Sequence, residues 1–433
     1  MSLPRYSEYK DSGVAWLAEI PAQWELKRLG YFFDERREKV SDKDFPALSV
    51  TKNGIVPQLE TAAKTDDGDN RKKVCSGDFV INSRSDRKGS SGISSLDGSV
   101  SLINTVLRPR AEVVPGYVHQ LLRSQSFQEE FYRFGKGIVA DLWSTNYSEM
   151  SNITLALPSR QEQTAIAAFL DRETAKIDGL IAEQEKLIAL LAEKRQATIS
   201  HAVTKGLNPD APMKDSGVVW LGEVPAHWEI KSIRHILDAI GDVDHFMPAS
   251  VEKGIPYLMT GDLKEFVSQV SLDDCKQISH NDYFELSKKI KSAKGDVIMA
   301  RYATIGTLMY VDVDVDFLVS YSCVTLKTNH SEVSGLYLFQ YMKSDAFRQG
   351  IENQINTNTQ SNVGIKDLQS VKIVAPPIKE QADIATFLDT ETARLDELTA
   401  EATHGIALLK ERRSALISAA VTGKIDVREA NNQ

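Results

Sequence analysis

Apolar residues recur at steps of three and four over two long segments of the chain, residues 158–204 and 376–422. This spacing places apolar side chains on one face of an α-helix and leaves charged and amide side chains on the other faces. The periodic positions of the first segment are Ile166, Phe169, Leu170, Ile177, Leu180, Leu187, Leu190 and Leu191. We therefore predict one long amphipathic helix in each segment, ended by Gly206 in the first and by Gly423 in the second.

The two predicted helices are too long to be covered by one small domain. About 43 residues at a rise of 1.5 Å each give a rod of roughly 65 Å. Ser159 and Glu162 fit a capping box at the start of the first helix, and the second has Pro377 there. Because each apolar stripe needs a partner, we expect the helices to pack on each other as an antiparallel coiled coil. The alternative is that each stripe docks on its own globular domain or on another protein.

The chain is an internal repeat. Residues 10–25 read KDSGVAWLAEIPAQWE and residues 214–229 read KDSGVVWLGEVPAHWE, with 12 of 16 positions identical. The two helical segments are identical at about 27 of 47 positions. The first pair is offset by 204 positions and the second by 218, so the region between them is about 14 residues longer in the second copy. The order of block, variable region and helix thus occurs twice, which predicts a pseudo-twofold arrangement.

Each variable region has the pattern of a globular α/β (α+β) domain. Runs such as GDFVINSR (77–84) and GDVIMARYATIGTLMYV (295–311) are rich in β-branched and aromatic residues, which is typical of strands. Closing segments, MSNITLALP (150–158) and LQSVKIVAPP (368–377), lead directly into the helices. We predict four parts: a domain at 1–157, a helix at 158–207, a domain at 208–375, and a helix with a tail at 376–433.

Composition narrows the class of protein. A chain of 433 residues with 42% apolar and 26% charged residues is ordinary for a globular protein of two or more domains. The sequence has no run of about eighteen apolar residues and no signal core, so we expect a cytoplasmic protein without membrane contact. Cys75, Cys275 and Cys323 are widely spaced, which argues against a disulfide framework or a zinc site. The net charge of −9 argues against a simple coating of nucleic acid but leaves local basic patches open.

The duplicated tryptophan block, the Gly-Asp-strand-Arg pattern, the closing segment and the EQxxIAxFLDxETAxID helix together resemble the specificity subunit of type I restriction-modification systems. This resemblance covers essentially the whole chain. It implies two target recognition domains, each reading one half of a bipartite double-stranded DNA sequence, separated by helices that also bind two methyltransferase subunits. A restriction subunit then joins the complex. The resemblance implies no cofactor in this chain, with S-adenosylmethionine, ATP and Mg²⁺ on the partner subunits.

Basic residues cluster in both variable regions. Residues 70–90 carry six basic against two acidic side chains, and residues 285–301 carry five against two. Arginine suits guanine, asparagine and glutamine suit adenine, and lysine mainly contacts phosphates. The candidate DNA-binding residues are Arg84, Arg87, Lys88, Lys136, Arg301, Tyr302, Asn358, Gln360 and Asn362, with Lys72 and Lys289 as phosphate contacts. Each alone could be a solvated surface residue, and it is the clustering in both copies that favours DNA binding.

The sequence contains little that indicates an enzyme. A methyltransferase would need a glycine-rich cofactor loop and an Asn/Asp-Pro-Pro-aromatic element, and neither is present. Asp312, Asp314 and Asp316 could in principle hold Mg²⁺, but an alternating strand facing solvent explains them better. We therefore expect a non-catalytic DNA reader without a metal site. The alternative is a duplicated coiled-coil scaffold that recruits enzymes without reading bases.

Four of the five tryptophans lie in the duplicated blocks, at Trp16, Trp24, Trp220 and Trp228. Our first interpretation is that they pack in the core against the long helices. The second is that they form a partner-binding surface, since large aromatic side chains are typical anchors at protein interfaces. A mixture of both is also possible.

Overall fold

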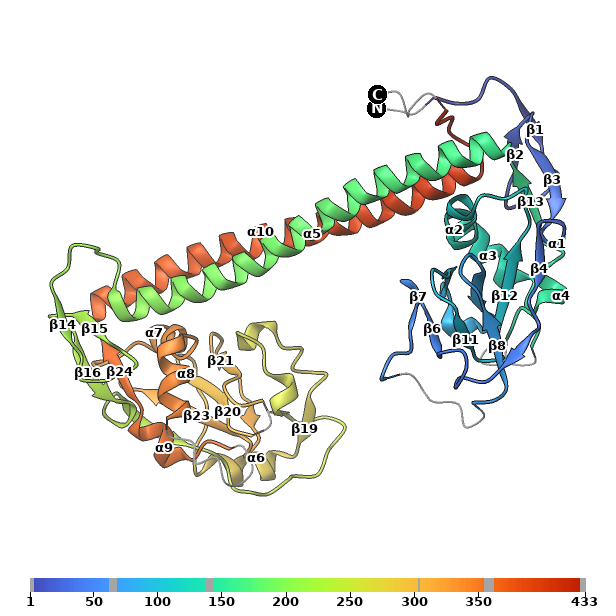
Figure 1. Ribbon diagram of the computed structural model, residues 1–433. Helices are drawn as coiled ribbons and strands as arrows, with labels where there is room; N and C mark the ends of the chain where they lie inside the picture. The colour runs from blue at the N-terminus through green and yellow to red at the C-terminus, as the bar shows by residue number, and fades with distance from the viewer. Residues whose placement is uncertain (1–3, 62–67, 138–142, 303, 354–361, 429–433) are drawn as a thin grey trace. The chain divides into compact units, whose positions relative to one another are not determined.

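The computed structural model describes residues 4–61, 68–137, 143–302, 304–353 and 362–428. The chain folds into two compact units, one of residues 1–185 with 403–433 and the other of residues 186–402 (Figure 1). Two long helices, α5 (Arg160–Lys205) and α10 (Ile378–Val421), contribute a part to each unit. The predicted α+β class and the two long helices are confirmed.

The first unit contains a mixed domain built mainly on an antiparallel sheet. The sheet has the order β10-β9-β12-β4, formed by Ser91–Ile93, Phe79–Asn82, Asn104–Pro109 and Phe33–Glu35. The other strands are β1 (Tyr9–Asp11), β2 (Glu19–Pro21), β3 (Glu25–Arg28), β5 (Lys39–Val40), β6 (Leu48–Thr51), β7 (Gly54–Pro57), β8 (Arg71–Val74), β11 (Gly98–Val100) and β13 (Thr154–Leu157). The helices are α1 (Leu29–Phe32), α2 (Pro115–Arg123), α3 (Gln125–Arg133) and α4 (Tyr147–Met150), with a 3-10 turn, η1, at Ser85–Arg87.

The second unit repeats this plan with a different periphery. Its four-stranded sheet has the order β17-β23-β20-β21, formed by Leu237–Gly241, Cys323–Thr328, Val297–Ala300 and Leu308–Tyr310. The other strands are β14 (Met213–Asp215), β15 (Glu223–Pro225), β16 (Glu229–Ser232), β18 (Ile255–Leu258), β19 (Lys276–Ile278), β22 (Leu318–Val319) and β24 (Lys372–Ala375). The helices are α6 (His280–Ser287), α7 (Gly335–Met342), α8 (Asp345–Glu352) and α9 (Ile365–Ser370), with 3-10 turns η3 (Ile233–His235), η4 (Thr260–Asp262) and η5 (Val267–Gln269).

The repeated Gly-Asp pair starts the inner strand of each main sheet. Gly77 and Gly295 have φ angles of 91° and 96°, a left-handed conformation that glycine adopts without strain. The Asp78 carboxylate accepts a hydrogen bond from the Cys75 backbone N–H at 2.8 Å, and Asp296 accepts one from Ala293 at 2.8 Å. The strands that follow, β9 and β20, are buried along their whole length, as their apolar runs predict.

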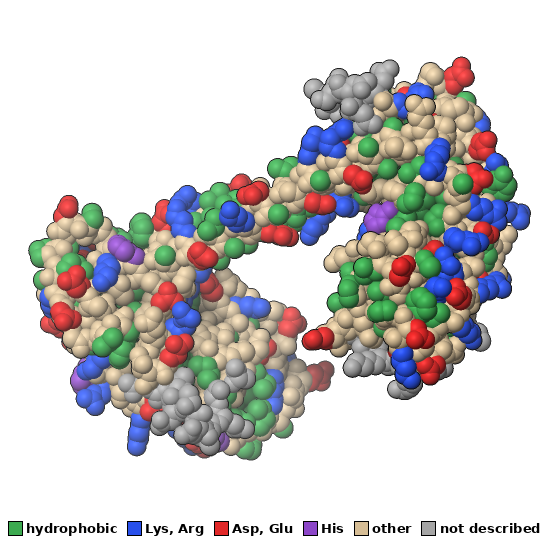
Figure 2. Space-filling view, in the orientation of Figure 1, with side chains coloured by type: hydrophobic (Ala, Val, Ile, Leu, Met, Phe, Trp, Pro, Cys, Tyr) green, Lys and Arg blue, Asp and Glu red, His purple; other side chains and the backbone are tan. Residues whose placement is uncertain are grey.

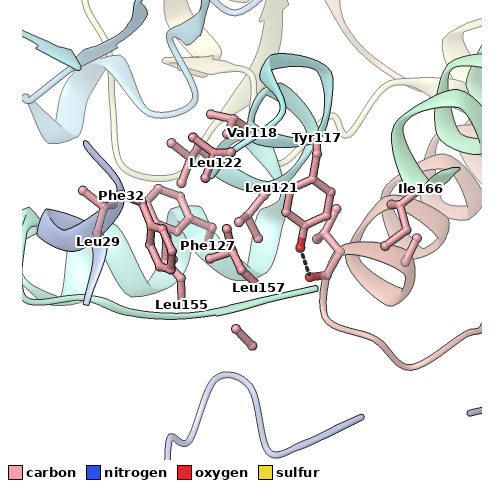
Figure 3. Close-up of a cluster of buried hydrophobic side chains, with 14 of the residues drawn as sticks. Leu29, Phe32, Tyr117, Val118, Leu121, Leu122, Phe127, Leu155, Leu157 and Ile166 are labelled. Atoms are coloured by element: carbon pink, nitrogen blue, oxygen red, sulfur yellow. Dashed lines mark hydrogen bonds between the residues drawn. The ribbon is translucent and has the colours of Figure 1, made fainter. Parts of the chain in front are cut away.

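The core of the first unit joins the domain to the ends of both long helices. Figure 3 shows Leu121 and Phe127, from α2 and α3, packed beside Leu155 of β13, with Ile166 of α5 in the same cluster. The Tyr117 hydroxyl donates a hydrogen bond of 3.2 Å to the Val421 carbonyl of α10. Burial of each such large apolar side chain stabilises the fold by about 1.5–3 kcal/mol.

The duplicated blocks fasten each domain to the start of its long helix. The Trp24 indole N–H donates to the Glu162 carboxylate of α5 at 3.1 Å, and Trp228 donates to Glu380 of α10 at 2.8 Å. In addition, β3 of the first block pairs with β13, and β16 of the second pairs with β24, which are the two closing segments. Each domain is therefore closed by a strand that continues within a few residues into a long helix.

The predicted capping box is correct in one half only. The Ser159 hydroxyl accepts a hydrogen bond of 3.3 Å from the Glu162 backbone N–H, as predicted. The Glu162 carboxylate instead accepts from Trp24, 138 positions away, because burial of the indole N–H requires an acceptor there. Gly206 and Gly423 follow the two helices with φ angles of 78° and 74°, which confirms the predicted ends.

The long helices run antiparallel and pack along a narrow seam. In the first unit Arg413 of α10 is paired with Asp178 of α5 at 2.8 Å, and in the second unit Arg195 of α5 is 3.2 Å from Asp396 of α10. The ends of the apolar stripes pack into the cores of the two domains, through residues such as Leu170 and Leu388. Both interpretations of the stripe thus hold, each for a different part of the helix.

Three leucines of the predicted stripe lie outside this seam. Leu180, Leu187 and Leu190 are exposed, although the three- and four-residue spacing placed them on the buried face. A two-helix coil covers only the side chains that point at the partner helix, and the seam passes through Ile177 and Leu191 instead. Hydrophobic side chains open to solvent are visible along the long helices in Figure 2.

Candidate DNA-recognition surfaces

In the first domain the structure brings four predicted DNA-binding residues to one end of the main sheet. Arg84, Arg87 and Lys88 lie on the turn that follows β9. Lys136 joins them because Ser144 forms backbone hydrogen bonds of 2.9 and 3.0 Å with Lys136 and a β-bridge with Arg84. Two segments more than fifty residues apart therefore form one loop cluster.

The side chains of this cluster point to solvent. The Lys136 side chain is 79% exposed, with its ammonium 3.2 Å from Glu149, and that of Arg87 is 67% exposed, 3.6 Å from Asp86. Arg84 is exposed, and Lys88 lies over the Tyr132 ring. Exposed cations beside loops are free to change partner, so they can reach phosphates or base edges. Blue basic side chains are distributed over both units in Figure 2.

The basic segment 70–90 does not form one patch. Arg71 is buried, and its guanidinium donates to the Ser99 hydroxyl at 2.9 Å. Lys72, the predicted phosphate contact, donates to the Asn104 carbonyl at 2.8 Å and lies 3.4 Å from Glu35. Lys73 is paired with Glu38 at 2.9 Å. Alternation along β8 sends these side chains to different surroundings, so the linear charge count overstates the local field.

In the second domain Arg301 is held inside the protein. Its side chain is only 6% exposed, and its guanidinium donates to the Asp242 carboxylate and, at 3.1 Å, to the Val363 carbonyl. Lys289, the second predicted phosphate contact, donates to the other Asp242 oxygen at 3.0 Å. Burial would raise the pKa of Asp242, but the hydrogen bond from Lys289 and the charge of Arg301 outweigh it and lower that pKa.

The loop after β20 corresponds to the exposed cluster of the first domain. Tyr302 forms a β-bridge with Asn362, and the Val363 N–H donates to the Arg301 carbonyl at 3.2 Å. Asn362 and Val363, which precede α9, are thus brought beside Arg301 and Tyr302. In the same way, Lys136 and Ser144 are brought beside Arg84 in the first domain. Asn358 and Gln360 lie outside the described residues. Asn362 is exposed.

The tryptophans divide into a buried and a half-buried pair. Trp24 and Trp228 are fully buried and belong to the cores of their units, as our first interpretation has it. Trp16 and Trp220 are only partly buried, although both pack against the same cores. The role of the four in partner binding stays a prediction.

Asp312, Asp314 and Asp316 do not lie on a strand. β21 ends at Tyr310, so the predicted alternating strand is wrong for residues 312–316. Asp312 accepts from the Ser268 N–H at 3.0 Å, and Asp316 accepts from Tyr283 at 2.8 Å and Lys291 at 2.6 Å. Asp312 therefore caps a turn, and Asp316 pairs with a lysine.

Asp242 is a site residue that the sequence did not indicate. It holds Arg301 from 59 positions away, within a segment without strong pattern. The sequence contained one indication that Arg301 is buried: it directly follows β20, whose residues are all buried, so its guanidinium is less favourably placed in solvent. No helix in the described part of the chain combines the length and the apolar character needed to cross a bilayer.

The chain carries two unlike α+β domains, each joined to one copy of a duplicated long helix. Residues 225–406 match the family model of the type I restriction modification DNA specificity domain. This chain is 21% identical to the putative type I restriction enzyme MjaX specificity subunit of Methanocaldococcus jannaschii, over 95% of this chain and 96% of that protein. It is also 22% identical to the EcoKI specificity subunit of Escherichia coli K12, over 74% of this chain and 68% of that protein.

Solved structures share the fold. The chain superposes with a TM-score of 0.69 on one from work on complex assembly and conformational transition of the type I R-M system, at 18% identity, covering 93% of this chain and 98% of that chain. For the HsdS subunit from Thermoanaerobacter tengcongensis the TM-score is 0.56, with the same identity and coverage. Together the matches confirm the predicted resemblance. This chain is similar to specificity subunits of type I restriction-modification systems, and its residues 225–406 match their DNA specificity domain.

Proposed function

We propose that this chain reads an asymmetric, bipartite DNA target, with one half read by each recognition domain, and recruits the enzymes that modify and cleave the DNA. The observation that carries the proposal is the pair of loop clusters after β9 and β20. They occupy corresponding positions in the two domains but carry different side chains, Arg84 with Lys136 in one and Tyr302 with Asn362 in the other. Different side chains at corresponding places cannot present one base code.

The duplicated helices support the recruitment of two identical partners. The exposed Leu180 and Leu190 of α5 recur as the exposed Leu398 and Leu408 of α10, each 218 positions later. In the first unit the antiparallel pairing brings Leu180 and Leu408 within about one helical turn along the helix pair. Exposed leucines in the same place of both repeats suit two equal apolar contacts, and we assign these to methyltransferase subunits, with a restriction subunit joining the complex.

We infer that the chain itself is not catalytic and that S-adenosylmethionine, ATP and Mg²⁺ act on the partner subunits. The purified chain should bind its target in preference to random DNA, alone or with methyltransferase partner, but neither methylate nor cleave it. Band-shift and radiolabelled methyl-transfer assays measure both properties. Equal affinity for target and random DNA in the assembled complex would favour the scaffold alternative instead.

The exposed arginine of the first cluster allows a test of base reading. If Arg84 contacts guanine, Arg84→Ala should cost about 1–3 kcal/mol with target DNA and relax the preference at one position of one half-site. Lys136→Ala should weaken all sequences alike and lower the salt slope by about one, because a lysine contacts phosphate. Binding to a library of half-site variants at several salt concentrations distinguishes the two. An equal loss for target and random DNA in Arg84→Ala would make Arg84 a phosphate contact.

The exposed leucines allow a test of recruitment. Leu180→Lys with Leu408→Lys should leave the chain folded but reduce the number of bound methyltransferase subunits from two to one, because both changes lie in one unit. The matched control is Ala182→Lys with Ala407→Lys, at exposed positions close to the same leucines. Native mass spectrometry counts the subunits. If both variants assemble alike, the leucines are not the contact.

A further inference from the structure

The first unit contains a basic pocket of about 460 Å³ that shares Lys88 with the recognition cluster but is otherwise lined by residues outside it. It lies between the turn before β10, helix α2 and the last third of α10. Its lining consists of Lys52, Lys88, Gly89, His119, Gln120, Arg123, Gln128, Arg413 and Ile417. Four of these nine residues are cations that keep their charge at neutral pH.

The cations of this pocket are poorly neutralised by the protein. Arg123 donates to the His119 Nε2 at 2.7 Å and to the Lys52 carbonyl, which are both neutral acceptors. Among the described residues, no carboxylate forms a salt bridge with Arg123, Lys52 or Lys88. Arg413 is paired with Asp178 at 2.8 Å, and Asp171 accepts a hydrogen bond from Gln120 at 3.1 Å.

His119 does not neutralise the cations of the pocket, because its imidazole carries no negative charge, and it also adds no positive charge. Burial, and then the charge of Arg123, lower the pKa of His119 to about 4; the charge of Asp171 opposes this shift, and that of Arg413 adds to it. The imidazole is therefore neutral at physiological pH. The pKa of Arg123 is lowered too, by burial and then by the charge of Arg413, so the two guanidinium groups repel each other across the pocket.

The second unit has a pocket at the corresponding place. Among the described residues, this second pocket has a carboxylate that the first one lacks. Tyr337 of α7 donates to the Val203 carbonyl at 3.2 Å, as Tyr117 of α2 donates to Val421, so the two helices dock alike. By this correspondence, Lys343 takes the place of Arg123 and Arg195 that of Arg413.

In the second unit a carboxylate of the chain itself joins these two cations. The Glu265 carboxylate lies 2.6 Å from the Lys343 ammonium and 3.4 Å from the Arg195 guanidinium. Phe339 stands at the position of His119, and Ile305 precedes Gly306 as Lys88 precedes Gly89. The second pocket is therefore more apolar and internally neutralised, whereas the first is more basic, and among the described residues no carboxylate bridges its Arg123 and Arg413.

We propose that the pocket of the first unit binds a phosphate group at the place that corresponds to the Glu265 carboxylate of the second unit. Guanidinium groups match the geometry of phosphate oxygens, and the two lysines add charge at the rim. The phosphate comes either from a DNA backbone or from a free phosphate compound. Only the DNA source rests on the proposed function.

The first experiment removes the rim charges. Isothermal titration of the full chain with inorganic phosphate should give one saturable site. Lys52→Gln with Lys88→Gln should weaken it at least tenfold, since both side chains are exposed and the fold does not depend on them. The charge-matched control, Lys43→Gln with Lys186→Gln, changes two exposed lysines outside the pocket lining and should stay within twofold.

Duplex DNA then distinguishes the two sources. If a backbone phosphate occupies the pocket, Lys52→Gln alone, which lies outside the recognition cluster, should lower the salt slope of DNA binding by about one relative to Lys43→Gln. If a free phosphate compound does, the slope stays unchanged while phosphate binding is lost. An unchanged slope together with unchanged or absent phosphate binding would overturn the proposal. Equal affinity of the unmodified chain, assembled with its partners, for target and random DNA would instead count against the proposed function.

The reverse change provides an independent test. Glu265→Gln removes the internal carboxylate from the second unit and leaves Lys343 and Arg195 together. The number of phosphate sites per chain should rise from one to two, with the fold verified by circular dichroism. A stoichiometry that remains at one in a folded Glu265→Gln protein would overturn the correspondence on which the proposal is built.

Discussion

Asp242→Ala should destabilise the second unit by about 3–5 kcal/mol and abolish recognition of one half-site while the other is still read. The Arg301 guanidinium is buried against Asp242, and removal of the carboxylate leaves a buried charge without its main counter-ion. Amide hydrogen exchange of β20 and β23 measures the free energy of opening in this unit. The pKa of Asp242 is lowered in the folded state, so its ionised carboxylate stabilises the fold fully at neutral pH. This stabilisation is lost only when the solution becomes strongly acidic and the carboxylate is protonated.

Asp244→Ala is the matched control for this prediction. Asp244 lies two positions away and is also 3.4 Å from Lys289, but its side chain is 70% exposed. Exposed pairs contribute little, so the variant should remain within about 0.5 kcal/mol of the wild type. An Asp242→Ala protein that matches this control would mean that Arg301 finds another counter-ion or turns to solvent, and the second domain would not depend on the pair.

Lengthening both long helices by one heptad should change the spacing of the DNA target. Seven residues inserted after Glu183 and seven after Glu401 lie near the ends of the compact units, so each recognition domain keeps its own part of the helices. Seven residues preserve the apolar seam and add about 10 Å of helix. At about 3.4 Å per base pair, the gap between the half-sites should grow by roughly three base pairs, with both half-site sequences unchanged.

Methylome sequencing of cells that carry the lengthened chain measures this gap directly. The control inserts the same seven residues in α5 only, which breaks the pairing of α5 with α10 and should abolish modification. Added spacer also turns one half-site around the DNA axis by about a third of a turn, so the shift can be smaller than three. A folded double-insertion variant that modifies the original spacing would show that the helices only hold partners.

Local patterns of the sequence determined the elements of this protein. The three- and four-residue spacing predicted both long helices, and Gly206 and Gly423 predicted where they end, because these signals depend only on neighbouring residues. The runs after each Gly-Asp pair predicted β9 and β20 for the same reason. The duplicated blocks predicted that the protein has two similar halves, since copies of one block fold alike.

Only the tertiary structure decided which side chains are available for function. Arg301 is buried because Asp242 approaches it, whereas Arg84, whose position corresponds to that of Tyr302, is exposed. Leu180 has the spacing of a core residue but faces solvent, because a pair of helices has a narrower seam than the apolar stripe. The basic pocket around Arg123 joins residues from Lys52 to Arg413. Its charge depends on whether a carboxylate reaches it, as Glu265 does in the second unit, and such long-range contacts leave no local pattern in the sequence.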